Sequence, residues 1–149
     1  MKYLNLFPLL ISSSALLGAY YFQYFEGLEP CQLCIWQRIP HYFIVAFYTL
    51  FLIRRYYKIF FAIGFASFIN IFISLYHVGV EKKIFSGLSS CGSDSLIGLT
   101  PEELIVKLSS TPTAKCNFVA WELLSISMAG WNAILSLISF CVIVYDIKR

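Results

Sequence analysis

Four cysteines and one arginine are the residues of this sequence best suited to chemistry. Cys31 and Cys34 form a C-x-x-C pair, and Arg38 follows Cys34 by four residues. Cys91 and Cys116 form a second, widely spaced pair, which could be a structural disulfide closing a long loop. A bridge between cysteines as close as Cys31 and Cys34 constrains the chain very little. The C-x-x-C pair therefore indicates redox chemistry or metal binding.

Metal binding is the less favoured use of this pair. A structural zinc site needs four ligands, and the sequence offers few partners beyond Cys91 and Cys116, which lack the C-x-x-C spacing. Attachment of haem requires a histidine directly after the second cysteine, where this chain has Ile35. We therefore expect thiol redox chemistry and no metal.

The local sequence favours a reactive thiolate. Pro30 suits the first position of a helix, which predicts that Cys31 and Cys34 lie in its first turns. Unpaired backbone N–H groups and the helix dipole stabilise a thiolate there. Gln37 and Arg38 follow Cys34 by three and four residues and share its helix face, so the guanidinium adds a fixed positive charge.

Composition places these residues in a membrane protein. Hydrophobic residues make up 59% of the 149 residues and charged residues 13%, with a mean hydropathy of +0.75. A soluble domain carries about 25% charged residues. The composition therefore excludes a soluble enzyme, a nucleic-acid binder and a disordered protein.

Gaps between charged residues predict four membrane-spanning helices. Three gaps contain 23, 22 and 23 residues, enough to cross about 30 Å of hydrocarbon. The remaining gap, between Arg38 and Arg54, is the second along the chain and contains only 15 residues. A helix over this gap spans the membrane if Arg38 lies at the membrane edge. We predict one membrane domain, residues 1–149, with spans at about 4–25, 36–53, 59–80 and 123–145 and outer loops at 26–35 and 81–122.

The loop charges predict the orientation. With the N-terminus inside, the inner segments carry a net charge of +5 and the outer segments −2, in agreement with the positive-inside rule. Both termini are then inside, and the two cysteine pairs lie on the outer, oxidising side. Within the spans, Cys141 is expected to be a small buried residue, and Asn70 and Asn132 are expected to face the bundle interior.

The predicted position of Arg38 at the membrane edge indicates which kind of molecule accepts the electrons. The plainer alternative is an interfacial residue whose guanidinium reaches back to water. However, Arg38 is the only charge between Glu29 and Arg54, and it faces a redox cysteine. A quinone in the lipid gains negative charge on its oxygens when a thiolate attacks it, and a guanidinium stabilises such charge. The combination predicts thiol oxidation coupled to a membrane quinone.

The segment Glu29–Arg38, which reads EPCQLCIWQR, resembles the E-P-C-x-L-C-x-x-Q-R signature of the disulfide bond formation protein B (DsbB) family. The four spans, the long second outer loop with its cysteine pair, and Tyr76-His77 at the end of the third span agree with this resemblance. It covers essentially the whole chain. It implies an all-α membrane protein, a four-helix transmembrane bundle in the bacterial inner membrane, with cytoplasmic termini and periplasmic cysteines.

The same resemblance implies an activity and a role for each cysteine. A DsbB-like protein reoxidises a periplasmic thioredoxin-fold dithiol oxidase (DsbA-like) and passes two electrons to ubiquinone or menaquinone. The disulfides would be Cys31–Cys34 and Cys91–Cys116. The partner would attack Cys91, and Cys116 would then exchange with Cys31. Cys34 would be freed as the thiolate that donates to the quinone.

Three further residues are candidates for contact with the quinone. Arg38 would hold the acceptor and stabilise its charge. His77 resembles a family residue near the quinone, although a histidine at a span end is equally well explained as an interfacial polar residue. Gln37 is the weaker third candidate.

The second outer loop is expected to contain a mobile arm and a short helix. Residues Ser86 to Gly98 are rich in Gly and Ser, which suits an arm that carries Cys116 to Cys31. Thr100-Pro101-Glu102-Glu103 predicts the start of a short helix, which would rest on the outer leaflet or pack against the bundle.

Two other functions stay open from the sequence. One is a membrane thiol oxidoreductase that serves a different dedicated partner. The other is a non-enzymatic membrane scaffold with two structural disulfides. A relay of electrons to the inner side would need paired cysteines there, and only Cys141 is available.

Overall fold

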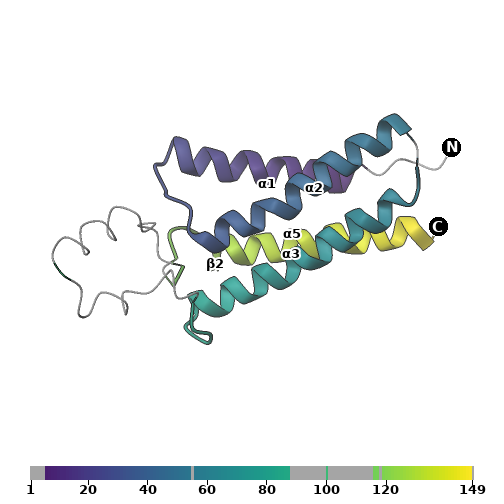
Figure 1. The fold of residues 1–149 in the computed structure, drawn as a ribbon. Coiled ribbons are helices and arrows are strands. Elements are labelled where there is room, and N and C mark those ends of the chain that lie inside the picture. The colour runs from purple at the N-terminus through teal and green to yellow at the C-terminus, as the bar shows by residue number, and fades with distance from the viewer. Residues whose placement is uncertain (1–5, 55, 88–99, 101–115, 118, 149) are drawn as a thin grey trace.

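Four long helices pack side by side in the computed structural model (Figure 1), which describes residues 6–54, 56–87, 100, 116–117 and 119–148. Helices α1 and α3 each pack against both α2 and α5, so that the bundle closes into a ring of four. The helices are α1 (Phe7–Tyr24), α2 (Gln32–Arg54), α3 (Ile59–Glu81) and α5 (Met128–Lys148). The predicted helical bundle is confirmed for the described part of the chain, whose only other regular structure is a small hairpin before α5.

The two ends of the bundle differ in what they hold. The start of α1, the end of α5 and the α2–α3 connection lie at one end, which we call the terminal end (Figure 1). The α1–α2 connection and the residues before α5 lie at the opposite end, which we call the cysteine end because Cys31 directly precedes α2. This arrangement agrees with four antiparallel helices joined by alternating loops.

The helix bounds follow the predicted spans closely at α3 and less closely elsewhere. Helix α2 begins at Gln32, four residues before the predicted span, and Pro40 lies within it. A proline inside a helix removes one backbone hydrogen bond, which neighbouring helices in a membrane bundle can compensate. Helix α2 is therefore longer than the 15-residue apolar gap, because it begins before the gap and also contains Cys34 and Arg38.

Helix α5 begins at Met128, five residues later than the predicted fourth span, because a small hairpin precedes it. Strand β1 (Glu122–Leu123) pairs with β2 (Ile126–Ser127) in antiparallel register. The turn between them places Leu124 and Ser125 at positive φ angles of 54° and 61°. The indole of Trp131 donates to the carbonyl oxygen of Leu123 at 3.2 Å, which ties the hairpin to α5.

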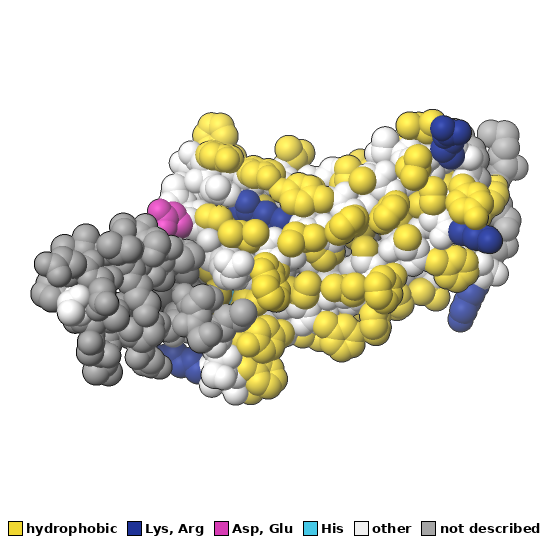
Figure 2. Space-filling model, viewed as in Figure 1, with side chains coloured by type: hydrophobic (Ala, Val, Ile, Leu, Met, Phe, Trp, Pro, Cys, Tyr) yellow, Lys and Arg dark blue, Asp and Glu magenta, His cyan; other side chains and the backbone are white. Residues whose placement is uncertain are grey.

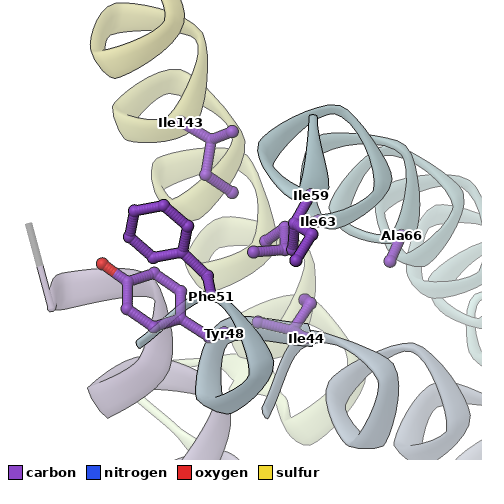
Figure 3. Packing of buried hydrophobic residues seen from close by; sticks show 7 residues of the cluster. All are labelled: Ile44, Tyr48, Phe51, Ile59, Ile63, Ala66 and Ile143. Carbon is purple, nitrogen blue, oxygen red and sulfur yellow. The ribbon is translucent and has the colours of Figure 1, made fainter. Parts of the chain in front are cut away.

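An apolar cluster fills the terminal half of the bundle. Tyr48 and Phe51 of α2 pack with Ile63 of α3 and Ile143 of α5 (Figure 3). Three of these side chains, those of Tyr48, Ile63 and Ile143, are fully buried. Burial of a large apolar side chain stabilises a fold by about 1.5–3 kcal/mol in water, and close packing takes over this role between helices in lipid.

The outer surface of the bundle is apolar. Hydrophobic side chains cover most of its flank, and Lys and Arg side chains appear at the terminal end and also toward the cysteine end (Figure 2). Among the described helices, α3 (hydropathy 2.1) and α5 (hydropathy 1.8) are long and apolar enough to cross a membrane. Asn70 is buried as predicted, but the prediction for Cys141 is wrong, because its side chain is exposed on this flank.

Most of the second outer loop lies outside the described residues. The part of the loop outside the described residues includes most of the predicted arm between Ser86 and Gly98, and the predicted short helix after Thr100. Both stay predictions.

Reporter fusions test the predicted orientation. The net charges of +5 and −2, and the placement of the start of α1 and the end of α5 at one end, predict that a fusion after Tyr57 reports the cytoplasm and one after Ser95 the periplasm. Alkaline phosphatase, which is active only outside, and green fluorescent protein, which is bright inside, provide opposite readouts. The reverse pattern would place the cysteines in a reducing compartment and contradict the account.

Candidate redox site

Cys31 and Cys34 lie together at the start of α2. Cys31 directly precedes the helix, and its carbonyl oxygen accepts from the N–H of Ile35 at 3.1 Å. Its sulfur accepts from the backbone N–H of Cys34 at 3.4 Å, which is the geometry of an N-terminal cap. Cys31 therefore occupies the capping position. The prediction that Pro30 takes the first helical position is wrong, because that position belongs to Gln32, two residues later.

The two sulfurs of this pair differ chemically. The Cys31 thiol donates to the Cys34 sulfur at a Sγ–Sγ distance of 3.1 Å. This hydrogen bond, aided by burial, raises the pKa of Cys31 to about 12, while the His77 imidazole opposes the shift. A donated hydrogen bond stabilises negative charge on the accepting sulfur. The same hydrogen bond lowers the pKa of Cys34. In the reduced state, Cys34 is therefore the sulfur that ionises more readily, and Cys31 is the one that keeps its proton.

A third cysteine lies in the same buried cluster. Cys116 packs with Cys31, Leu33 and Val80, and Cys34 lies against this cluster. Cys31 and Cys116 are both at least 95% buried. The fold thus brings Cys116 to the C-x-x-C pair although more than 80 residues separate them in the sequence.

Cys91, the predicted point of attack by the partner, lies outside the described residues. The disulfides Cys31–Cys34 and Cys91–Cys116 both stay predictions. Cys31 and Cys34 carry free thiols in the structure.

His77 of α3 faces the cysteine pair. Its Nε2 lies 3.5 Å from the Cys31 sulfur and 3.9 Å from a carboxylate oxygen of Glu81. Its Nδ1 accepts from the Gln37 amide at 2.9 Å. The Gln37 carbonyl oxygen in turn accepts from the Asn132 amide at 3.0 Å, which sets the orientation of the Gln37 side chain. These bonds leave the ring proton of His77 on Nε2, facing Cys31.

Arg38 lies one turn after Cys34 and contacts α1. Its guanidinium donates to Gln23 Oε1 at 2.6 Å and to the carbonyl oxygen of Ala19 at 3.4 Å, and it lies 5.2 Å from the centre of the Tyr20 ring. A guanidinium has five N–H donors. The contacts with α1 therefore hold Arg38 in place and leave donors for a further ligand.

A cavity of about 230 Å³ opens between α1, α2 and α5. Its polar lining comes mainly from α2, which contributes Cys34, Gln37, Arg38 and His41. Most of the remaining wall is apolar or aromatic, and includes Ala19, Phe22, Leu28, Trp121, Trp131 and Leu135. The predicted residues Cys34, Arg38 and Gln37 thus share one cavity, whereas His77 is not part of its wall and faces Cys31.

The same groups have the spacing of metal ligands. The sulfurs of Cys31 and Cys34 and a ring nitrogen of His77 lie within 4.8 Å of one another. A disulfide between the two sulfurs would remove both as ligands, because a metal binds the thiolate. Metal binding and disulfide exchange are therefore mutually exclusive uses of this pair.

Comparison with known proteins identifies the family. The model of the family "Disulfide bond formation protein DsbB" matches residues 2–145. The chain belongs to the DsbB family. A disulfide bond formation protein B of Xanthomonas axonopodis is 32% identical over 127 residues, which cover 78% of this chain and 72% of the relative. One of Xylella fastidiosa is 32% identical over 137 residues, covering 83% and 76%.

An uncharacterized protein of Rickettsia prowazekii is also similar, with 31% identity over 150 residues, which cover 97% of this chain and 84% of the relative. Membership of the DsbB family, together with the apolar helices α3 and α5, makes this chain a membrane thiol oxidoreductase of disulfide bond formation.

Three residues of the DsbB site were not singled out from the sequence as part of it. They are His41, Asn132 and Glu81, which bond to or lie beside the predicted residues. His41 carried a usable signal, because it follows Arg38 by three residues and an ionisable side chain within a span marks a functional site. Asn132 was expected only to face the interior, and its link to Gln37 crosses 95 residues of sequence.

Alkylation tests the difference between the two thiols. With the other three cysteines replaced by serine and the pair reduced, iodoacetamide at pH 8 should modify Cys34 at least about tenfold faster than Cys31, because only the thiolate reacts. Cys31 should react readily only near pH 12. Peptide mass spectrometry assigns the modified residue.

The matched control is Cys34→Ala, which removes the hydrogen-bond acceptor and should make Cys31 reactive at a lower pH. Faster modification of Cys31 in the unsubstituted pair would show that the proton lies on the other sulfur.

Proposed function

We propose that this protein is an inner-membrane thiol:quinone oxidoreductase that reoxidises a periplasmic thioredoxin-fold dithiol oxidase and thereby sustains disulfide bond formation. The observation that carries the proposal is the shared cavity of Cys34 and Arg38, with Cys31 and Cys116 in the adjoining buried cluster. This arrangement supports a path for electrons from a thiol cluster at the end of the bundle to a site between the helices.

The cavity fits the ring of a quinone. A cavity of about 150 Å³ binds benzene, so about 230 Å³ accommodates a substituted ring. The apolar wall suits the faces of the ring, and the spare donors of Arg38 suit a carbonyl oxygen. A bound quinone, either ubiquinone or menaquinone, supplies a two-electron acceptor. Cys34 and Arg38 would hold it, and Gln37 borders the same space.

The thiol exchanges conserve bonds at every step. The partner's thiolate attacks Cys91, which breaks the Cys91–Cys116 disulfide, forms a mixed disulfide and releases Cys116 as a thiolate. Cys116 attacks Cys31, which breaks the Cys31–Cys34 disulfide and releases Cys34 as a thiolate in the cavity wall. The partner's second thiolate then displaces Cys91. Cys91 attacks Cys116, which restores their disulfide and leaves Cys31 reduced.

The surroundings of the two thiols support this order. Cys116 lies in the cluster of Cys31, so the second exchange needs little movement from the described arrangement. The N–H of His77 faces the Cys31 sulfur and stabilises negative charge on it when Cys31 leaves as a thiolate. Cys31 then takes up one of the two protons that the partner's thiols release, and its thiol donates to Cys34, which keeps the negative charge on the sulfur next to Arg38.

Trapping of the partner tests the order of attack. Cys91→Ser should abolish the covalent complex with the partner, because the first mixed disulfide cannot form. In Cys116→Ser, Cys91 is a free thiol that can attack the disulfide of the oxidised partner, which releases one partner sulfur as a thiolate. The mixed disulfide should then accumulate, because no Cys116 thiol remains to displace the partner from Cys91. Non-reducing gels of membranes that contain both proteins measure the complex. A trapped complex in Cys91→Ser would contradict the assigned order.

Substitution of Arg38 tests the quinone step. Loss of a charge-stabilising donor costs about 3 kcal/mol, or about a hundredfold in rate. Arg38→Ala should therefore slow quinone reduction by about that factor, and Arg38→Lys by less, because lysine keeps the charge but loses the planar fork. Steady-state kinetics with a soluble quinone should show a raised KM, a lowered kcat, or both.

The partner's attack on Cys91 serves as the internal control. In a single-turnover experiment, this half-reaction should stay near the wild-type rate in both Arg38 variants, because its chemistry occurs in the second loop. Equal slowing of the two half-reactions would make Arg38 a structural anchor between α2 and α1 instead.

A further inference from the structure

His41 is a buried histidine that neither thiol exchange nor the charge of Arg38 explains. It lies in α2, seven residues after Cys34, and only 3% of its surface is exposed. It lines the same cavity as Cys34 and Arg38. An ionisable side chain inside a membrane bundle carries a cost that a structural role met by an apolar residue would avoid.

One ring nitrogen of His41 lies between a hydrogen-bond acceptor of one asparagine and a hydrogen-bond donor of another. Its Nε2 is 2.8 Å from Asn132 Oδ1, which can only accept, and 3.0 Å from Asn70 Nδ2, which can only donate. The Asn132 amide nitrogen is used by Gln37 and Ser74, at 3.0 Å each, which sets the orientation of its side chain. Each of the two neutral forms of the His41 ring therefore has a matching asparagine.

The Asn70 side chain is set in the same way. Its amide nitrogen donates to Ser136 Oγ at 2.8 Å as well as to His41, so both of its N–H groups are used. When Asn70 donates to Nε2 of His41, the ring proton is on Nδ1. When Nε2 donates to Asn132, Nδ1 carries a lone pair.

The other ring nitrogen, Nδ1, is buried and has no hydrogen-bond partner in the described part of the chain. A buried polar atom without a hydrogen-bond partner destabilises a fold, and His41 as a residue lines the cavity, so its unpartnered ring nitrogen favours a ligand that supplies the missing hydrogen bond. Because α3 and α5 engage Nε2, only Nδ1 is left for a molecule in the cavity.

We infer that His41 is a quinone ligand that hydrogen-bonds, through Nδ1, to an oxygen of the ring held by Cys34 and Arg38. With Asn70 donating to Nε2, Nδ1 donates to the carbonyl oxygen of an oxidised quinone. With Nε2 donating to Asn132, Nδ1 accepts from the hydroxyl of the reduced quinone. The asparagine pair thus lets one histidine bind substrate and product, and the inference rests on the proposed quinone reaction.

Quinone binding by fluorescence tests this role without turnover. Trp121 and Trp131 line the cavity, so a bound quinone should quench their emission. The probes are a one-isoprene ubiquinone, titrated into the oxidised protein, and its hydroquinone, titrated into the reduced protein under argon. Neither pair reacts, so the titrations report binding alone.

The expected results separate His41 from its neighbours. His41→Leu should weaken both probes about tenfold, the loss of one buried hydrogen bond. His41→Gln, which has both a donor and an acceptor, should restore binding of both to within about threefold of wild type. Asn70→Leu should weaken the quinone about fivefold and the hydroquinone less than twofold, because it removes support for one ring form only.

Ser67→Ala is the matched control. Ser67 is a fully buried polar residue of α3 whose hydroxyl has no partner among the described residues, and it does not line the cavity. This variant should bind both probes like wild type, and circular dichroism should give equal helix content for all variants.

The outcomes separate a failure of the proposed quinone function from a failure of the proposed role of His41. No binding of either probe by the wild-type protein would overturn the proposed quinone function. Wild-type binding with an unchanged His41→Leu, with His41→Gln no better than His41→Leu, or with Ser67→Ala equally impaired would overturn only the role of His41. Equal weakening of both probes by Asn70→Leu would overturn the pairing of ring forms with asparagines.

Discussion

Lipid offers no hydrogen-bond partner, so polar side chains between membrane helices must satisfy one another. At the cysteine end of this bundle, Asn132 of α5 does this for three helices, since it bonds to Gln37 and His41 of α2 and to Ser74 of α3. The orientation of Gln37 then fixes the ring form of His77, whose proton faces the redox sulfur. One half-buried amide therefore orients side chains both beside the cysteine pair and in the cavity wall.

Polar groups and apolar packing occupy different halves of the bundle. Polar groups surround the cavity near the cysteine end, whereas the terminal half is packed with aromatic and aliphatic side chains such as Tyr48 and Ile143 (Figure 3). The cysteine cluster and the polar lining of the cavity thus lie in the half of the bundle opposite the apolar cluster.

Local patterns in the sequence predicted the parts of this arrangement that depend on neighbouring residues. Charge gaps located the helices, and the four-residue offset placed Arg38 with Cys34 at one site. The hairpin before α5 was missed because strands of two residues have no detectable period. The contact of His77 with Cys31 joins residues 46 apart, and no local pattern encodes which face of α3 meets which turn of α2.

The most direct test of the central claim is the stoichiometry of one turnover in purified, reduced protein. One equivalent of a short-chain ubiquinone is added anaerobically, hydroquinone is measured by absorbance, and lost thiols are counted by mass spectrometry. The account predicts one hydroquinone for each Cys31–Cys34 pair oxidised, and none in Cys34→Ser. Persistent thiols with unreduced quinone, or equal quinone reduction by Cys34→Ser, would contradict it.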